Sequence, residues 1–436
     1  SVINRKPSDY FCEDASGRLC PARESVYAAL QEQVRRLFDR WPAAAGLVMR
    51  TGEVYPEATP HMVGSALHVS SCPACRAMTL QDRLVRLITA LHEVVIRELD
   101  KVYVHRAWQP AIPGLPNMHD DPAVYREVAS RSPQSPQLAF SFKFTRGDFR
   151  YAAVGATRAG AETTRTGGFN PCLLVDHRPK WIEFQCEREF EGKGAFPNYQ
   201  APLWREFLEH LGAAVSPEEL RRRFSLWGWS RGGGWGGPYV RREEWIDANV
   251  HALAALYRNP AEDPVEIATA WTAEMFHVAQ SAPPTPAIVE LLMLSAPTLR
   301  QLLYVNTGTT PGAIRGGSPW VKDDLLDVEA IWAAAQEVSA GAAPADAACA
   351  EKREALRLVD RLRQVFDLAV PDLPNKSQAR DLANTLAYLG SFAGTVTHLF
   401  IGFVRFAQWS RGGTHPAAAI ADRTALAAES AADLQQ

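Results

Sequence analysis

Short apolar runs and longer amphipathic segments alternate along the first half of the chain. Residues 24–41 (ESVYAALQEQVRRLFDRW) place apolar side chains at helical spacing, and the run AGLVM at 45–49 then predicts a buried strand. A second helical pattern at 80–100 leads into the strand-like run KVYVHRAW at 101–108. This alternation predicts strands that are separated by crossover helices.

The alternation continues to about residue 230. Three further runs, LAFSFKF, WIEFQCE and FSLWGWS, predict strands at 138–144, 181–187 and 224–230, with a helix at 202–212 before the last of them. Strands joined by helical crossovers form a parallel sheet. Each run ends in charged or aromatic residues, as strands do at the active-site end of a (β/α)8 TIM barrel. A Rossmann-like sheet is the weaker alternative, because no GxGxxG follows an early strand.

Beyond about residue 240 the strand-like runs stop and helical patterns continue. We therefore expect two domains, a barrel part at 1–238 and an all-helical domain at 239–436. The most apolar segment, 387–406, contains His398, Arg405 and many small or polar residues. These interruptions favour a buried helix over a membrane span, so no membrane association is expected.

Composition narrows the class of protein. The 436 residues are 47% hydrophobic and 22% charged, which is typical of a soluble protein with a sizeable core. A net charge of −3 provides no broad basic surface for nucleic acid or for an anionic membrane. No leader-like apolar segment opens the sequence SVINRKPSDYF, and this start is uninformative about export. We expect a reducing, cytoplasmic compartment from the cysteine usage.

Cysteine usage agrees with a reducing compartment. Seven cysteines form no dense disulfide framework in a chain of this length. Cys72 and Cys75 make one CPAC motif, which suits a redox pair or half of a zinc site. No second CxxC and no well-spaced HxxxH accompany it, so two loop thiols are the favoured interpretation. The sequence therefore predicts no metal.

Three carboxylates follow three of the predicted strands. Glu53, Asp148 and Glu189 each lie just after an apolar run, and a barrel would bring the three together. Carboxylates around one cleft suit glycoside hydrolysis, in which one protonates the leaving oxygen and others activate water. Each is also compatible with a solvated or salt-bridged residue, and Asp148 can simply pair with Arg146.

The glutamates of one run compete for the third position. Strand alternation places 183, 185, 187 and 189 on one side, and 182, 184 and 186 on the other. The pattern alone does not choose between Glu183, Glu187 and Glu189.

Aromatic and cationic residues near the strand ends supply candidate substrate contacts. Tryptophan rings can pack against the C–H faces of a pyranose, and arginine or lysine can hold a uronate. Ordinary core packing and pairing with nearby acids are the alternatives. The candidate substrate-binding residues are Arg50, Arg106, Trp108, Lys143, Arg146, Lys193, Trp229 and Arg231.

The order of these segments resembles that of the family 67 α-glucuronidases. The similarity lies in GLVMRTGEVYPE, KVYVHRAW, FSFKFTRGDF, WIEFQCEREFEGKGAFPNYQAPLWREFL and GGGWGGPYVRREEWIDANVHALAALYRNP. The resemblance implies an inverting glycoside hydrolase with a (β/α)8 barrel followed by a helical domain. It further implies an oligosaccharide substrate bearing a uronic acid, no cofactor, and a homodimer formed through the helical region.

The resemblance also assigns roles. Glu53 in RTGEVYP matches the family's acid, and Asp148 in RGDF and Glu189 in EFQCEREFEGKG match its two water-activating carboxylates. The chain departs from the family in the loop after Asp148, which lacks the family's Gln-Val-Arg-Glu-Pro run. It also lacks counterparts of the first three barrel strands, so we expect only strands 4–8. A carbohydrate-binding protein without turnover is the alternative function.

Overall fold

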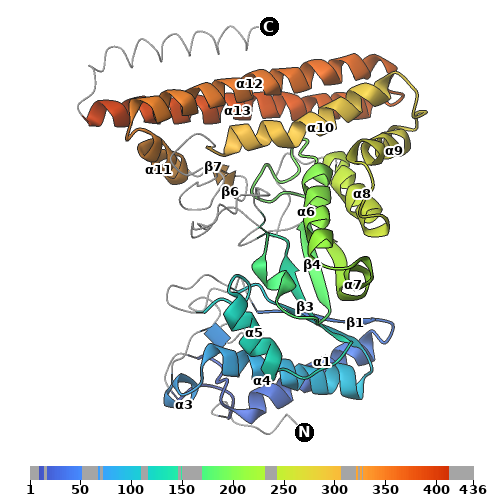
Figure 1. The fold of residues 1–436 in the computed structure, drawn as a ribbon, viewed down its shortest axis with the longest axis vertical. Helices are drawn as coiled ribbons and strands as arrows, with labels where there is room; N and C mark the ends of the chain where they lie inside the picture. Colours follow the sequence, from blue (N-terminus) through green and yellow to red (C-terminus); the bar gives the residue numbers. More distant parts are fainter. Residues whose placement is uncertain are drawn as a thin grey trace. The chain divides into compact units, whose positions relative to one another are not determined.

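A computed structural model describes most of the chain (Figure 1). The chain divides into two compact units. The first unit comprises Ser1–Gly147, Asn170–Glu183 and Gly212–Trp227, and the second comprises the remaining segments. The segments of the two units alternate along the chain. A single domain boundary at residue 238 therefore stays a prediction. The described residues are 9–13, 17–51, 67–68, 72–109, 116–145, 149, 169–230, 243–305, 321–322, 325–326 and 328–411.

A five-stranded sheet runs in the order β1-β2-β3-β4-β5, which is also the order of the strands in the sequence. Each strand falls within one of the five predicted runs, to within one residue at its ends. The pairs from β1 to β4 are parallel, which confirms a mixed α/β fold built on a parallel sheet. Among the described residues the sheet is open, with β1 and β5 at its edges, and the assignment of its strands to strands 4–8 of a (β/α)8 barrel remains a prediction. The strands are Gly46–Arg50, Val102–Arg106, Leu138–Lys143, Lys180–Gln185 and Phe224–Trp229.

Helices cover one face of the sheet in the first unit (Figure 1). The helix α1 (Glu24–Arg40) packs beside α4 (Leu80–His92), which continues as the π-helical turn η3 (Glu93–Glu98). Thr79 caps α4 by accepting a hydrogen bond from the backbone N–H of Asp82 at 3.1 Å. Three shorter helices belong to the same unit, namely α3 (Pro73–Arg76), α5 (Pro122–Arg131) and α7 (Pro217–Arg223).

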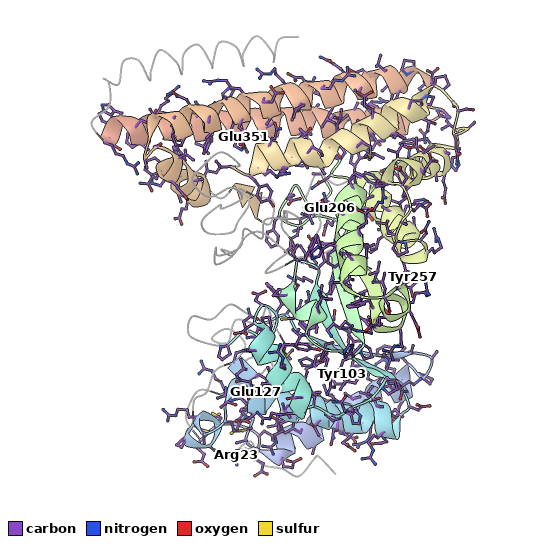
Figure 2. All side chains as sticks on the ribbon, viewed as in Figure 1. Arg23, Tyr103, Glu127, Glu206, Tyr257 and Glu351 are labelled. Atoms are coloured by element: carbon purple, nitrogen blue, oxygen red, sulfur yellow. The ribbon has the colours of Figure 1, made fainter. Side chains whose placement is uncertain are left out.

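The helix-covered face of the sheet is apolar and aromatic. Tyr103 of β2 (Figure 2), and Phe140 and Phe142 of β3, are completely buried there. The ring of Tyr125 on α5 meets both phenylalanine rings edge-on, at centroid distances of 5.3 and 5.0 Å. Burial of these large rings contributes to the driving force that holds the helices on the sheet.

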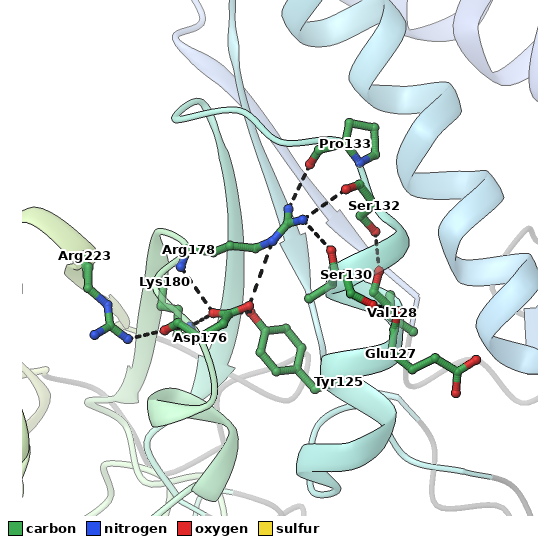
Figure 3. A network of polar contacts seen from close by, with 11 residues as sticks. Tyr125, Glu127, Val128, Ser130, Ser132, Pro133, Asp176, Arg178, Lys180 and Arg223 are labelled. Atoms are coloured by element: carbon green, nitrogen blue, oxygen red, sulfur yellow. Dashed lines mark hydrogen bonds and ion pairs between the residues drawn. The ribbon is translucent and has the colours of Figure 1, made fainter.

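A polar network joins α5 to the segment at the amino end of β4 (Figure 3). The hydroxyl of Tyr125 donates to Asp176 at 2.9 Å, and the ammonium of Lys180 forms an ion pair with the same carboxylate. Arg178 donates to the carbonyls of Ser132 and Pro133 at 3.0 and 2.8 Å. Burial lowers the pKa of Lys180 and of Arg178. This network lies at the end of the strand where parallel sheets carry stabilising contacts.

In its described residues the second unit is mainly helical, and it also contains the carboxyl ends of β4 and β5 and the two-residue strands β6 (Val321–Lys322) and β7 (Leu325–Leu326). Its longest helices, α12 and α13, pack against each other, and α10 packs on α12. The helices are α6 (Ala201–Ala214), α8 (Glu244–Arg258), α9 (Pro264–Phe276), α10 (Pro284–Leu303), α11 (Val328–Val338), α12 (Ala342–Ala369) and α13 (Lys376–Ser410).

Helix α13 contains the most apolar segment of the sequence. In the part of the chain that the structure describes, it is the one helix that is long and apolar enough to cross a membrane, and 39% of its apolar window is buried. Its buried residues, among them Leu382, Leu389 and Val396, recur at three- and four-residue spacing and form a stripe. Core helices of soluble proteins have the same length and composition, so a buried core helix stays the prediction.

Candidate functional site

The face of the sheet opposite to the apolar one is polar. Arg106 of β2 donates through Nε to the two carboxylate oxygens of Glu183 on β4, at 2.9 and 2.8 Å. Ser141 of β3 donates to the same carboxylate at 2.7 Å, and the indole N–H of Trp227 on β5 donates to Ser141 Oγ at 3.0 Å. One chain of hydrogen bonds therefore links four neighbouring strands.

Tryptophan rings surround this chain of hydrogen bonds. The ammonium of Lys143 lies 3.4 Å from the centroid of the Trp108 ring, two residues beyond the end of β2. The rings of Trp181 and Trp227 meet at an interplanar angle of 65°, with centroids 6.2 Å apart. Trp108, Trp181 and Trp227 are half-buried, so each keeps part of its ring accessible. We call Arg106, Trp108, Ser141, Lys143, Trp181, Glu183 and Trp227 the polar face.

The polar face is unusual for a parallel sheet. Strands in such sheets are commonly apolar on both faces, because helices cover both. Here Arg106, Lys143 and Glu183 are at most 3% exposed. Removing ionic groups from water costs free energy that apolar side chains at these positions would not require. The location of these groups at and near the carboxyl ends of parallel strands, where such folds bind ligands, makes the polar face our candidate site.

Glu189 follows β4 and is held by the last residue of that strand. Its backbone N–H donates to the side-chain oxygen of Gln185 at 2.7 Å, and the amide of Gln185 donates to the Glu189 carboxylate at 2.9 Å. Glu189 is half-buried, whereas Glu183 and Glu187 are 0% and 2% exposed. Of the three competing glutamates, Glu189 has the most accessible side chain.

The loop that carries Glu189 adopts a constrained backbone. Arg188 and Lys193 have φ angles of 58° and 50°, which only a minority of non-glycine residues adopt. Arg188 pairs with Glu191 at 2.7 Å, and both side chains are buried. The hydroxyl of Tyr304 on the segment after α10 donates to Glu191 at 2.5 Å. Backbone strain of this kind persists where surrounding contacts enforce it, and it often marks a functional loop.

The other residues predicted from the sequence are distributed as follows. Arg50 ends β1 and is exposed, and Trp229 ends β5, where its carbonyl accepts from the backbone N–H of Cys186 at 2.8 Å. Lys193 is completely buried. Glu53, Arg146, Asp148 and Arg231 lie outside the described residues.

A second candidate site lies in the first unit. The sulfur atoms of Cys12, Cys20, Cys72 and Cys75 all lie within 4.8 Å of one another. The separation is 3.9 Å between Cys12 and Cys75, 3.6 Å between Cys20 and Cys72, and 3.5 Å between Cys72 and Cys75. All four side chains are buried, and we call them the four-cysteine centre.

The backbone conformation of two segments brings the four thiol groups close together. Residues 10–12 and 18–20 run antiparallel, with reciprocal bonds of 2.8 Å from Cys12 N–H to the Arg18 carbonyl and from Cys20 N–H to the Tyr10 carbonyl. The CPAC segment forms a tight turn into α3, in which Cys72 N–H donates to the sulfur of Cys75 at 3.3 Å. Burial opposes ionisation of Cys72, but hydrogen bonds from Cys75 and the other thiols outweigh it and lower its pKa to about 7.

The sequence provided only half of this centre. Cys72 and Cys75 stood out through their spacing, and the sequence favoured two loop thiols because no second CxxC was visible. The second pair is Cys12 and Cys20, whose seven intervening residues fit no common ligand motif. The signal that could have indicated the whole centre is the presence of two pairs of cysteines in a chain that was expected to be cytoplasmic.

Comparison with known proteins yields no assignment: neither family models nor curated protein sequences match the chain.

Proposed function

We propose that the chain is an inverting glycoside hydrolase that acts on an oligosaccharide bearing a uronic acid. The observation that carries this proposal is the polar face, where half-buried tryptophans surround hydrogen-bonded ionic groups near the carboxyl ends of parallel strands. Sugars present C–H groups that pack on aromatic rings and hydroxyl groups that bond to charged side chains. The polar face offers both kinds of contact within one surface.

The catalytic roles in this proposal come from the resemblance to the α-glucuronidases. Glu53 protonates the glycosidic oxygen, and Asp148 and Glu189 position and deprotonate water. The accessible, hydrogen-bonded carboxylate of Glu189 suits this role. Glu183 does not suit it, because Arg106 and Ser141 occupy its oxygens.

The proposal includes a finer description of the fold. The five parallel strands, in sequential order, correspond to strands 4–8 of a (β/α)8 barrel. Within that arrangement the polar face would line the barrel interior. Arg50 at the end of β1 is exposed and is suited to hold the uronate. Arg106 and Lys143 are buried, and their role is to neutralise Glu183 and to position the ring of Trp108.

A carbohydrate-binding protein without turnover is the second candidate. The Arg106–Glu183 pair favours it, because the one carboxylate of the polar face is already neutralised by a cation. Such a face can bind a glycan through its tryptophans without performing acid–base chemistry.

The two candidates differ in their dependence on carboxylates. The test uses the full chain and a panel of glucuronoxylan-derived and neutral oligosaccharides, with proton NMR recording the anomer that is released. Wild-type protein is compared with Glu53→Gln, Glu189→Gln and a control, Glu329→Gln, whose side chain is exposed on α11. The hydrolase predicts the inverted anomer from the wild type and the control, and none from the other two variants.

Other outcomes reject the hydrolase. Activity that survives both substitutions removes these carboxylates from the mechanism. Glycan binding by calorimetry without hydrolysis, with affinities within a few fold across all variants, supports the binding protein. Absence of both binding and hydrolysis rejects both candidates.

A further inference from the structure

We propose that Cys12, Cys20, Cys72 and Cys75 bind one zinc ion that holds the first unit together. Four thiolates about 2.3 Å from a central Zn²⁺, at the corners of a tetrahedron, lie about 3.8 Å apart. Three of the sulfur pairs are separated by 3.5, 3.6 and 3.9 Å, and no pair of the four exceeds 4.8 Å. The thiols therefore already stand close to the spacing that zinc requires.

The chemistry of the ligands selects among metals. Soft thiolates in a tetrahedral S₄ set favour zinc or iron over magnesium or calcium, which prefer oxygen. A cuboidal iron–sulfur cluster places an iron beside each of four separated thiolates, and it would need more space than sulfurs within 4.8 Å leave. A single ion fits. Since four protein ligands leave no position for water or substrate, the ion is structural.

Disulfide bonds are the main chemical alternative. A bonded sulfur pair is about 2.0 Å apart, well below the separations in the centre. None of the four cysteines forms a disulfide bond in the structure. Cys72 and Cys75 each have two sulfur neighbours at 3.5 to 3.9 Å, and all four sulfurs lie within 4.8 Å of one another, whereas two disulfides would separate the sulfurs into two bonded pairs.

A buried arginine on α4 contacts the backbone around the four-cysteine centre. Arg83 of α4 is buried and donates to the carbonyls of Leu67, Cys75 and Met78 at 2.8 to 2.9 Å. A zinc ion with four thiolates carries a net charge of −2, and attraction between Arg83 and both Cys75 and Cys12 opposes that excess. Outer contacts of this kind orient ligands and preserve the geometry of metal sites.

The position of the centre shows what the ion would stabilise. Cys20 lies just before α1, and Cys75 lies just before α4. Arg86 of α4 donates to the carbonyls of Pro21 and Ala22 at 3.2 and 3.0 Å, and so joins the same two segments. Zinc would hold together the segments that precede α1 and α4, two of the helices that cover the apolar face of the sheet. Its binding free energy would become folding free energy of this unit.

The first test measures metal in the purified full chain. Mass spectrometry of the metal content should find about one zinc per chain, and replacement by Co²⁺ should produce the intense visible bands of tetrahedral thiolate coordination. Cys12→Ser and Cys75→Ser should each lose the zinc and the bands. The controls Cys172→Ser and Cys349→Ser, which remove buried thiols outside the centre, should keep both.

A second measurement does not depend on the folding of any variant. In the wild type under reducing conditions, a chelator should release zinc, make four additional cysteines reactive toward an alkylating agent, and lower the thermal midpoint of unfolding. Peptide mapping should place the new alkylation on the four residues of the centre. Stoichiometric iron in place of zinc would overturn the zinc assignment. Absence of metal together with absent Co²⁺ bands, or disulfides among these residues under anaerobic reduction, would overturn the site.

Discussion

Arg106 and Glu183 form an ion pair across the sheet in which the two side chains are 4% and 0% exposed. Both carboxylate oxygens lie within 2.9 Å of the guanidinium Nε, and Ser141 adds a third hydrogen bond. The pair connects β2 directly with β4 across the intervening strand β3. A buried arrangement of this kind is sensitive to the loss of either member, because the partner is left charged and unsolvated.

We expect Glu183→Gln and Arg106→Met each to lower the free energy of unfolding by about 3–5 kcal/mol. The double variant Arg106→Met/Glu183→Leu should recover much of that loss, because neither member of the pair is left without its partner. Arg36→Gln, which breaks an exposed pair with Glu32 on α1, is the control and should change stability by less than about 1 kcal/mol. Urea titration of each variant measures the effect. Equal losses for the buried and exposed pairs would contradict the burial of this pair.

Trp227 should contribute to glycan binding through its accessible ring face. We expect Trp227→Phe to retain most of the affinity, and Trp227→Ala to weaken binding about tenfold, because only the latter removes the aromatic platform. Calorimetric titration with neutral and acidic oligosaccharides measures both variants. Trp409→Ala on α13 is the control, since that ring is 40% exposed in the other unit. Unchanged affinity of Trp227→Ala would remove this ring from the binding surface.

Two glycines should respond to alanine in opposite directions. Gly192 has a φ of 97°, and an added Cβ would lie 2.2 Å from the ring of Phe196. We expect Gly192→Ala to destabilise the chain by about 1–3 kcal/mol, since both backbone and ring must shift. Gly212 lies inside α6 with no atom within 4 Å of an added Cβ, so Gly212→Ala should stabilise it by about 0.5–1 kcal/mol. Thermal and urea unfolding of the two variants measure the difference in sign.

His105 should make the chain acid-sensitive. It is completely buried, its Nδ1 lies 2.9 Å from the Tyr103 hydroxyl, and burial lowers its pKa to about 3. Between pH 6.5 and pH 3 the unfolded state therefore binds more protons than the folded state, so stability falls as the pH is lowered through this range. From about pH 7 to about pH 4.5 this histidine alone should remove about 2–3 kcal/mol.

A matched pair of variants isolates this contribution. His105→Asn keeps an acceptor for Tyr103 but does not titrate, so its stability should fall less than that of the wild type over the same range. His177→Asn removes an imidazole that is 81% exposed and should keep the wild-type slope. Urea unfolding at several pH values measures the slopes. Identical slopes for His105→Asn and the wild type would show that His105 is not the acid-sensitive group.

The sequence alone determined the secondary structure of this protein well. Five apolar runs became five strands in the predicted order, and the predicted helices at 24–41 and 202–212 became α1 and α6. Both outcomes depend on periodicity, which is a local property: side chains repeat every two residues in a strand and about every 3.6 in a helix. The alternation within the run 181–187 also correctly placed Glu183 on the face opposite to Ile182.

Only the tertiary structure decided which distant residues meet. Arg106 and Glu183 are 77 positions apart, and Cys12 and Cys75 are 63 positions apart. No local period connects such pairs, because their contact depends on how strands align and on how loops return to the same place. Glu183 and Glu189 were indistinguishable by pattern, yet one is neutralised by a buried arginine and the other keeps an accessible carboxylate. The four-cysteine centre was hidden for the same reason, since one of its two pairs has a ligand spacing and the other becomes a pair only through folding.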